Sequence, residues 1–279
     1  MNTMEFQGQG KTTEYKQRGI QRIIEINLKC VCANPTKYVS RFCYWHLDLH
    51  AGGGWNELAG CMGTPLAFKA AMAAHGKEFF RAYFCDKSHP AIHQLFERPE
   101  IGPDDRCFVF PGDNREVIAV FAAEIRRIEN KPQHANGSII CDPNGYFYGE
   151  GVPQDELAEF CREFPKIDLI MNLNVLTLQR MRPHVRKGKG KWGEACLLEI
   201  SDLPFLLNRK YWLIRNVLQK GGERFVLLVG RNFRIGEDRE FGLRFMDSPQ
   251  GQAILRKIGD PKCTLPLTTS ISDTLSFGS

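Results

Sequence analysis

Four aspartates follow short apolar runs in this sequence, and each stands at a position where a side chain can bind a ligand. Asp48, Asp86 and Asp142 stand at the ends of apolar runs with strand character, and Asp113 follows a fourth such run after a proline and a glycine. Ligands of an open parallel sheet bind outside the carboxyl ends of its strands. If the runs are parallel strands, these carboxylates meet at one edge, where they can bind hydroxyl or amino groups.

The first aspartate is followed by a glycine loop, which reads Ala51-Gly52-Gly53-Gly54. Consecutive glycines let the backbone approach a ligand closely, because they carry no Cβ. Asp48, just before the loop, can accept a hydrogen bond or anchor a charge. A plain glycine-rich turn is the alternative to a binding loop.

The second and third aspartates each allow two interpretations. Asp86 fits a residue that binds the two hydroxyls of a ribose, and it equally fits a cap of the next helix. Asp113 fits an acceptor for the exocyclic amine of a base, and it equally fits the N-cap of the helix predicted behind it. The residues alone leave both choices open.

The fourth aspartate begins the run Asp142-Pro143-Asn144-Gly145-Tyr146. An acid and a proline at a strand end, with an aromatic side chain close behind, can hold an amino group and stack on a planar ring. Asp-Pro and Asn-Gly are also common turn dipeptides, so a type I or II turn is the alternative.

A dense basic run follows the fifth predicted strand and contains no acid. Its six cations are Arg180, Arg182, Arg186, Lys187, Lys189 and Lys191. Such a run is typical of a phosphate-binding segment, and a solvated loop is the alternative. Trp192, just beyond it, fits either a stack on a base or a buried anchor. We expect a flexible arm on the same rim as Asp142.

The elements that must position these residues are read from apolar periodicity. Strands are predicted at 44–49, 79–86, 107–110, 138–141, 168–173 and 225–230, and helices at 64–72, 91–97, 115–128 and 154–164. Strands that alternate with amphipathic helices predict a parallel sheet covered by helices. We expect a helical N-terminal extension at 1–43, an α/β domain at 44–260 and a flexible tail at 261–279.

Composition narrows the class of protein. The 279 residues are 43% hydrophobic and 25% charged, with a net charge of +5, as in an ordinary globular protein. No apolar stretch reaches the ~18 residues of a membrane span, and the polar start predicts no secretory signal. The ten cysteines are therefore expected as reduced thiols in a cytoplasm. Cys30 and Cys32 lack zinc spacing, so no metal site is expected.

Taken together, the motifs resemble a class I S-adenosylmethionine-dependent methyltransferase. The sequence Asp48-Leu-His-Ala-Gly-Gly-Gly matches a first motif of the form Asp-x-x-Ala-Gly-x-Gly, and the Gly63-Thr64-Pro65 segment matches a Gly-Ser-Pro-Leu helix start. Within that class the chain resembles the three-Cys-motif partner proteins of bacteria and phages, and more distantly the ribosomal RNA adenine-N6 methyltransferases. The resemblance spans residues 40–175. It implies a Rossmann-like parallel-sheet sandwich of the class I methyltransferase type.

The resemblance implies that S-adenosylmethionine is the cofactor. In such a family the glycine loop binds the methionine part, and the matching positions here are Asp48, Ala51, Gly52 and Gly54. The acid that ends the second strand binds the ribose, which implies this role for Asp86. The acid after the third strand contacts the adenine, which implies this role for Asp113.

The resemblance also implies a catalytic motif behind the fourth strand. In amino-methyltransferases this motif is Asp/Asn-Pro-Pro-aromatic, which holds the target amine and stacks the aromatic ring on an extruded base. The matching residues are Asp142, Pro143 and Tyr146. Here Asn144 replaces the second proline, and the aromatic residue comes one position late.

The leading expectation is therefore methyl transfer to an exocyclic amine of a nucleic-acid base, with DNA or RNA left open. We expect a nucleic-acid partner, no membrane, and room for a protein partner. One alternative is a methyltransferase for a small molecule or a protein, and another is a non-catalytic nucleic-acid-binding partner on the same fold. A nicotinamide-dependent dehydrogenase fits less well, because the loop lacks the Gly-x-Gly-x-x-Gly spacing.

Overall fold

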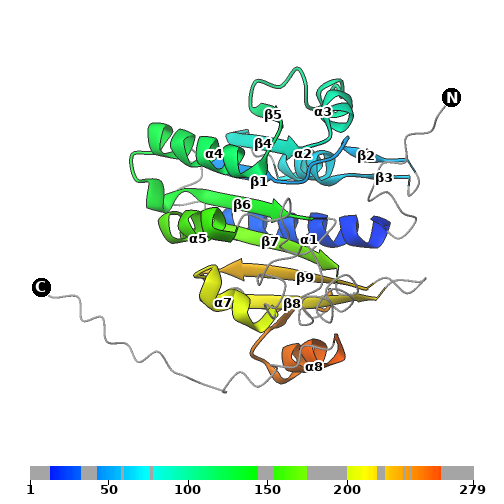
Figure 1. Cartoon of the computed structure of the whole chain (residues 1–279), viewed down its shortest axis with the longest axis vertical. Coiled ribbons are helices and arrows are strands. Elements are labelled where there is room, and N and C mark those ends of the chain that lie inside the picture. The colour runs from blue at the N-terminus through cyan, green and yellow to red at the C-terminus, as the bar shows by residue number, and fades with distance from the viewer. Residues whose placement is uncertain are drawn as a thin grey trace, which may run out of the picture.

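A computed structural model describes residues 13–32, 43–57, 60–75, 78–143, 154–174, 200–218, 224–234, 237–238 and 241–258. An eight-stranded sheet forms the centre of this described part (Figure 1). Its strands are β1 (Tyr44–Asp48), β4 (Phe80–Asp86), β5 (Cys107–Pro111), β6 (Asn136–Cys141), β7 (Ile167–Asn174), β8 (Tyr211–Leu218), β9 (Arg224–Arg231) and β10 (Arg244–Phe245). A separate hairpin joins β2 (Trp55–Asn56) to β3 (Cys61–Met62).

The strands lie in the order β10-β8-β9-β7-β6-β1-β4-β5. β1 is parallel to both β4 and β6, β5 is parallel to β4, and β7 is parallel to β6. Five parallel strands in the spatial order third-second-first-fourth-fifth are the Rossmann arrangement, with its switch point beside β1. The prediction of a Rossmann-like α/β fold is confirmed.

The predicted parallel sheet is present in these five strands, whereas the far side of the sheet is antiparallel. β9 runs antiparallel to both β7 and β8, and β10 runs antiparallel to β8. The connection between β8 and β9 spans only residues 219–223. A parallel pair needs a crossover of about a dozen residues or more. The short connection between β8 and β9 therefore permits only a hairpin.

Helices cover both faces of the sheet. One face carries α1 (Thr13–Cys32), α2 (Thr64–Ala74) and α3 (His89–Phe96), whose apolar side chains share one buried cluster. The other face carries α4 (Asn114–Ile128), α5 (Gln154–Glu163), α7 (Leu203–Leu206) and α8 (Pro249–Lys257), with a second cluster. Short 3-10 turns, η1 (Pro132–His134) and η3 (Ile200–Asp202), complete the described elements. The result is a three-layer α/β/α sandwich.

The predicted strands and helices are confirmed within one or two residues at most boundaries, and the predicted helical start is present as α1. α1 lies against α2, β6 and β7, and it crosses behind the middle of the sheet in Figure 1. Its side chains Ile20, Ile23, Ile24 and Leu28 are buried in the same cluster as the sheet residues. α1 is thus a layer of the sandwich, whereas the tail at 261–279 lies outside the described residues.

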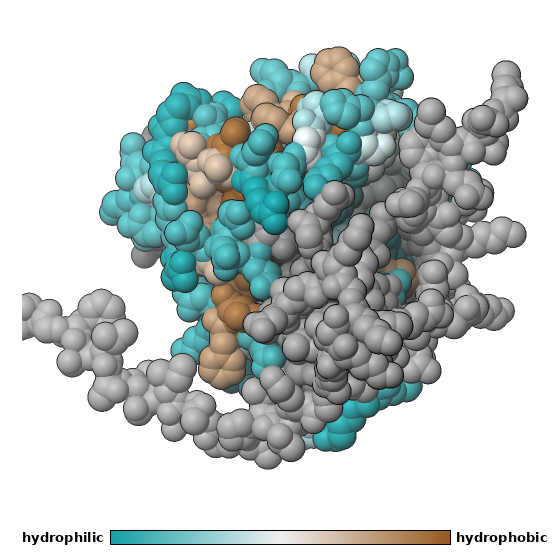
Figure 2. Space-filling view, viewed as in Figure 1, coloured by the Kyte–Doolittle hydropathy of each residue, from teal (hydrophilic) through white to brown (hydrophobic). Residues whose placement is uncertain are grey.

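The surface of the described part is mainly polar. In Figure 2, apolar side chains lie in small groups among hydrophilic ones. The large hydrophobic side chains that are most exposed include Phe79, Phe96, Phe205 and Phe233. No helix in this part of the chain is long and apolar enough to cross a membrane.

A buried polar cluster fixes α1 to the sheet. Asp168, at the start of β7, accepts hydrogen bonds from Asn27 Nδ2 of α1 and from Arg231 Nη2 of β9. Tyr44 donates its hydroxyl to Asn27 Oδ1 at 2.5 Å. Burial raises the pKa of Asp168, and the Arg231 guanidinium opposes that rise. The carboxylate therefore depends on Arg231 for its charge compensation.

Replacing Arg231 by methionine is expected to lower the free energy of unfolding by about 3 to 5 kcal/mol, because it leaves Asp168 buried without its cation. The matched control is Arg126→Met, which removes an exposed ion pair with Glu163 and is expected to cost under about 1 kcal/mol. Urea denaturation of both variants measures the difference. Equal losses would show that the buried cluster does not hold α1 in place.

Candidate active site at the carboxyl edge of the sheet

Three of the four aspartates lie beside the switch point. Asp48 ends β1, Asp86 ends β4, and Asp142 follows directly after β6. Because β1 pairs in parallel with both β4 and β6, the three residues lie at the carboxyl ends of adjacent strands. The sequence prediction that these carboxylates meet at one edge is confirmed.

Asp48 is fully buried and holds the glycine loop from inside. Its carboxylate accepts hydrogen bonds from Thr64 Oγ1, at the start of α2, and from the backbone N–H of His50 at 3.0 Å. Burial raises the pKa of Asp48 to about 7, and Asp142 and Asp86 add to that rise against the two hydrogen bonds. These bonds give Asp48 a structural role, and a direct contact with a cofactor stays a prediction.

The glycines of the loop differ in what surrounds them. Gly52 has a φ of +60°, and a Cβ placed on it would meet no atom of the described residues within 4 Å. Gly54 has a φ of +80°, and a Cβ there would meet Leu95 at 2.9 Å. The left-handed φ explains why glycine stands at both positions. No described residue packs against the Cα of Gly52, whereas Gly54 is packed against α3.

Two further backbone bonds fix the shape of the loop. The carbonyl of Gly54 accepts a hydrogen bond from the N–H of Gly63 at 2.7 Å, which closes the loop just before α2. The N–H of Ala51 donates to the carbonyl of Cys85 at 2.9 Å. Ala51 is buried, so it joins the loop to the end of β4.

Asp86 links the glycine loop to β4. Its Oδ2 accepts the N–H of Gly52 at 2.9 Å, and its Oδ1 accepts the N–H of Ser88 at 2.8 Å. The helix-cap alternative is wrong for Asp86, because Ser88 is the N-cap of α3. A carboxylate offers about four lone pairs. Asp86, which is partly exposed, keeps acceptor capacity for a ligand hydroxyl.

Asp113 caps α4, as one of its two interpretations predicted. Its Oδ1 accepts the N–H of Arg115 at 2.9 Å, and Lys87 Nζ lies 3.6 Å from its Oδ2. The backbone bond from Arg115 and the nearby Lys87 lower the pKa of Asp113. A contact between this partly exposed side chain and an adenine stays a prediction.

Asp142 is bound by two side chains that no sequence motif predicted. Lys16 Nζ, from α1, lies 2.8 Å from its Oδ2, and Asn172 Nδ2, from β7, donates to its Oδ1 at 2.8 Å. The N–H of Asp142 donates to His50 Nδ1 at 3.2 Å. Pro143 is buried, and Tyr146 lies outside the described residues.

Beside Asp142, two buried polar atoms have no hydrogen-bond partner within the described part of the chain. They are His50 Nε2 and Asn172 Oδ1. Burial lowers the pKa of His50 to about 4, so its ring is neutral at pH 7. Since Nδ1 accepts the Asp142 N–H, we assign the ring hydrogen to Nε2. One donor and one acceptor are therefore left for a ligand, and buried polar atoms are rarely left unpaired.

The remaining predicted binding residues lie outside the described residues. They are Arg180, Arg182, Arg186, Lys187, Lys189 and Lys191, together with Trp192. β7 ends at Asn174, so the basic run follows the strand that carries Asn172. Its place on the same rim as Asp142 stays a prediction.

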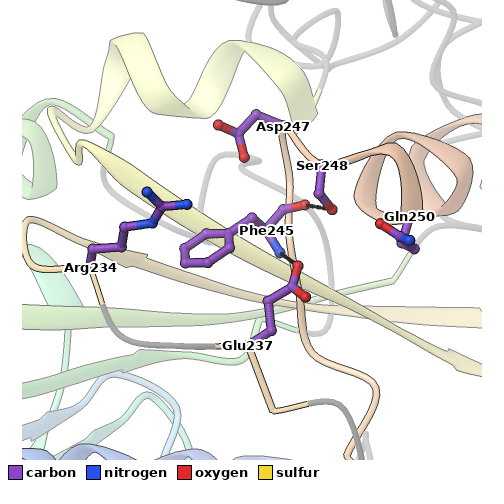
Figure 3. Close-up of a pocket in the computed structure, with 6 residues that line it drawn as sticks. All are labelled: Arg234, Glu237, Phe245, Asp247, Ser248 and Gln250. Atoms are coloured by element: carbon purple, nitrogen blue, oxygen red, sulfur yellow. Dashed lines mark hydrogen bonds between the residues drawn. The ribbon is translucent and has the colours of Figure 1, made fainter.

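A hollow of about 610 Å³ lies elsewhere on the molecule (Figure 3). It is lined by Arg234, Glu237, Phe245, Asp247, Ser248 and Gln250. The residues come from the segment after β9 and from around β10. The end of β9 pairs with the start of β7, so this hollow belongs to the opposite edge of the sheet from Asp142. In the described ranges, no group of three His, Cys, Asp or Glu residues is arranged to hold a metal ion.

No family model matches the chain, and no curated protein matches it. Among solved structures, a Legionella pneumophila protein aligns over 84% of this chain and 90% of its own, with 11% identity and a TM-score of 0.49. A probable spermidine synthase from Corynebacterium glutamicum aligns over 85% of this chain and 70% of its own, with 12% identity and a TM-score of 0.43. The bifunctional kinase-methyltransferase WbdD aligns over 79% of this chain and 40% of its own, with 16% identity and a TM-score of 0.43. The strand order, with its switch point beside β1, makes the chain a Rossmann-like α/β sandwich.

Proposed function

We propose that the protein is an S-adenosylmethionine-dependent methyltransferase that acts on an exocyclic amine of a nucleic-acid base. The observation that carries the proposal is the surroundings of Gly52. Among the described residues nothing lies against a Cβ there, its N–H is bound by Asp86, and its loop follows β1 at the switch point, next to β6 and Asp142. Ligands of open α/β sheets bind at this point.

The residues around Gly52 fit the proposed cofactor. A side chain at Gly52 would enter space that no described residue fills, so glycine keeps room for a ligand against the backbone. Asp86 is fixed by two backbone N–H groups and retains free lone pairs, which suits the two hydroxyls of a ribose. Asp113, at the end of the neighbouring strand β5, supplies a further carboxylate along the same edge.

Asp142 would act on the acceptor. When bound, the cofactor supplies a methyl group on a sulfonium. The Asp142 carboxylate would accept an N–H of the target amine and orient the nitrogen lone pair toward that methyl group. Placement of the two reacting groups in line is the main requirement of such a transfer. Lys16 and Asn172 hold the carboxylate in one orientation.

The proposal is tested by incubating the purified chain with radiolabelled S-adenosylmethionine and with denatured DNA, total RNA, a lysine-rich peptide or no acceptor. Mass spectrometry of the digested nucleosides locates the methyl group. We expect a methylated exocyclic nitrogen in one nucleic acid. Label found only on the peptide, or on no acceptor at all, would contradict the proposal.

The basic run supplies a separate prediction about nucleic-acid binding. Replacing Arg186, Lys187, Lys189 and Lys191 together by alanine is expected to weaken binding and to flatten its dependence on salt. Each phosphate contact contributes a slope of about 0.9 on a duplex or about 0.7 on a single strand. Fluorescence anisotropy at several salt concentrations measures both slopes, and cofactor affinity is the control. Identical slopes for parent and variant would show that the run is a solvated loop.

A further inference from the structure

We infer that Lys16 is a specificity-determining residue: by pairing with Asp142 it makes the acceptor site select a neutral, ring-conjugated amine and reject a protonated alkyl amine. The inference rests on the proposed function and deepens it, since it names a residue on α1 that separates nucleobase acceptors from lysine-type acceptors. It depends on contacts at Asp142 that no sequence motif contains.

Lys16 is held in place as part of the fold. Its Nζ lies 2.8 Å from Asp142 Oδ2, and both side chains are only 9% exposed. The ring of Phe225, at the start of β9, lies 5.7 Å from the same Nζ. One turn further along α1, Ile20 is fully buried in the core. The ammonium group therefore reaches Asp142 from a helix anchored in the sandwich.

The pairing changes what Asp142 can attract. Asp48 ends the adjacent strand β1, and Asp86 ends β4, the next strand along, so a lone Asp142 would stand in a cluster of acids that draws cations. With Lys16 on Oδ2 and the Asn172 amide on Oδ1, the charge of the carboxylate is compensated. Oxygen lone pairs still remain to accept an N–H from a neutral group.

An alkyl amine meets two obstacles in such a site. Its ordinary pKa is near 10.4, so it is protonated at neutral pH and has no lone pair to receive a methyl group. It would also have to approach a carboxylate that already holds an ammonium group, and placing like charges side by side is costly. Lys16 occupies the position that a substrate ammonium would take.

The exocyclic amine of adenine or cytosine meets neither obstacle. It is neutral, it presents N–H donors, and it stands next to a ring nitrogen that accepts a hydrogen bond. The site offers complementary atoms that are unpaired in the described part of the chain: the acceptor Asn172 Oδ1 and the donor His50 Nε2–H. Both side chains are bound directly to Asp142 or to its backbone N–H. This donor and acceptor pattern fits the amine edge of a base.

The test compares Lys16→Met, which removes the charge, with Lys16→Arg, which keeps it. Binding of Nα-acetyl-lysine amide is followed by ligand-observed NMR without cofactor, and methyl transfer is measured on denatured nucleic acid and on a lysine-rich peptide. Lys16→Met is expected to bind the lysine probe at least about tenfold more tightly than the parent. It is also expected to lose preference for nucleic acid over peptide, because the Asp142 carboxylate freed from Lys16 can hold the alkyl ammonium group and take up its proton, while Lys16→Arg retains the preference.

The matched control is Lys69→Met, which removes another lysine–aspartate pair, with Asp104, away from the site; its acceptor preference should stay that of the parent. If Lys16→Met does not fold, Lys16→Gln takes its place in the same comparison. Unchanged probe binding in a folded, neutral variant would overturn the inference, as would faster transfer to nucleic acid with unchanged preference. Because the binding readout needs no turnover, tighter probe binding together with no transfer to any acceptor would support the role of Lys16 and contradict the proposed function.

Discussion

Replacing Asp142 by alanine is expected to reduce methyl transfer by at least about 10²-fold while the affinity for S-adenosylmethionine stays within about threefold. A rate loss of this size is typical when a side chain that holds the proton of the reacting group is removed. The cofactor is retained because its proposed contacts, at Gly52 and Asp86, do not involve the Asp142 side chain. Single-turnover rates and calorimetry measure the two effects separately.

This variant leaves Lys16 without its partner, so its fold must be checked by thermal melting. Asp142→Asn, which keeps an acceptor oxygen of the same size, serves as the milder variant. Asp105→Ala, an exposed carboxylate ahead of β5, is the control that should retain full activity. Activity equal to the parent in a folded Asp142→Ala protein would exclude Asp142 from the transfer step.

Replacing Asp86 by alanine is expected to weaken S-adenosylmethionine binding by about 1.5 to 3 kcal/mol, the value of a hydrogen bond to a charged group. The loss has two sources. The ribose would lose its acceptor, and the N–H of Gly52 would lose the oxygen that fixes the loop. Calorimetry with Asp105→Ala as the control measures the difference. Unchanged affinity in a folded Asp86→Ala protein would remove Asp86 from the cofactor site.

The sequence predicted the centre of the sheet well because β1, β4, β6 and β7 each contain a short run of apolar residues. Such runs are typical of parallel strands that are buried on both faces. β8 escaped prediction, since Arg215 and Asn216 interrupt its apolar pattern. The antiparallel direction of β9 was also not predicted, because it depends on β8 and on the short connection between the two strands. Neither property is visible in the apolar run of β9 itself.

The candidate site was predictable only where a functional residue stands at the end of a predicted strand. The acids Asp48, Asp86 and Asp142 were found by that rule, and the helix start at Thr64 was confirmed. The function of the Thr64 hydroxyl was not predictable, because the hydroxyl donates a hydrogen bond to Asp48 and does not cap α2. Lys16 and Asn172 reach Asp142 from elements distant in the chain, and only the tertiary fold brings them together.

The proposed function requires that the edge beside Gly52 and Asp86 bind S-adenosylmethionine. Isothermal titration of the purified full chain with S-adenosylmethionine tests it most directly, with NAD titrated in parallel. We expect one saturable site for S-adenosylmethionine, weakened in Asp86→Ala, and no site for NAD. A folded protein that binds NAD instead, or that binds S-adenosylmethionine equally well with and without Asp86, would contradict it.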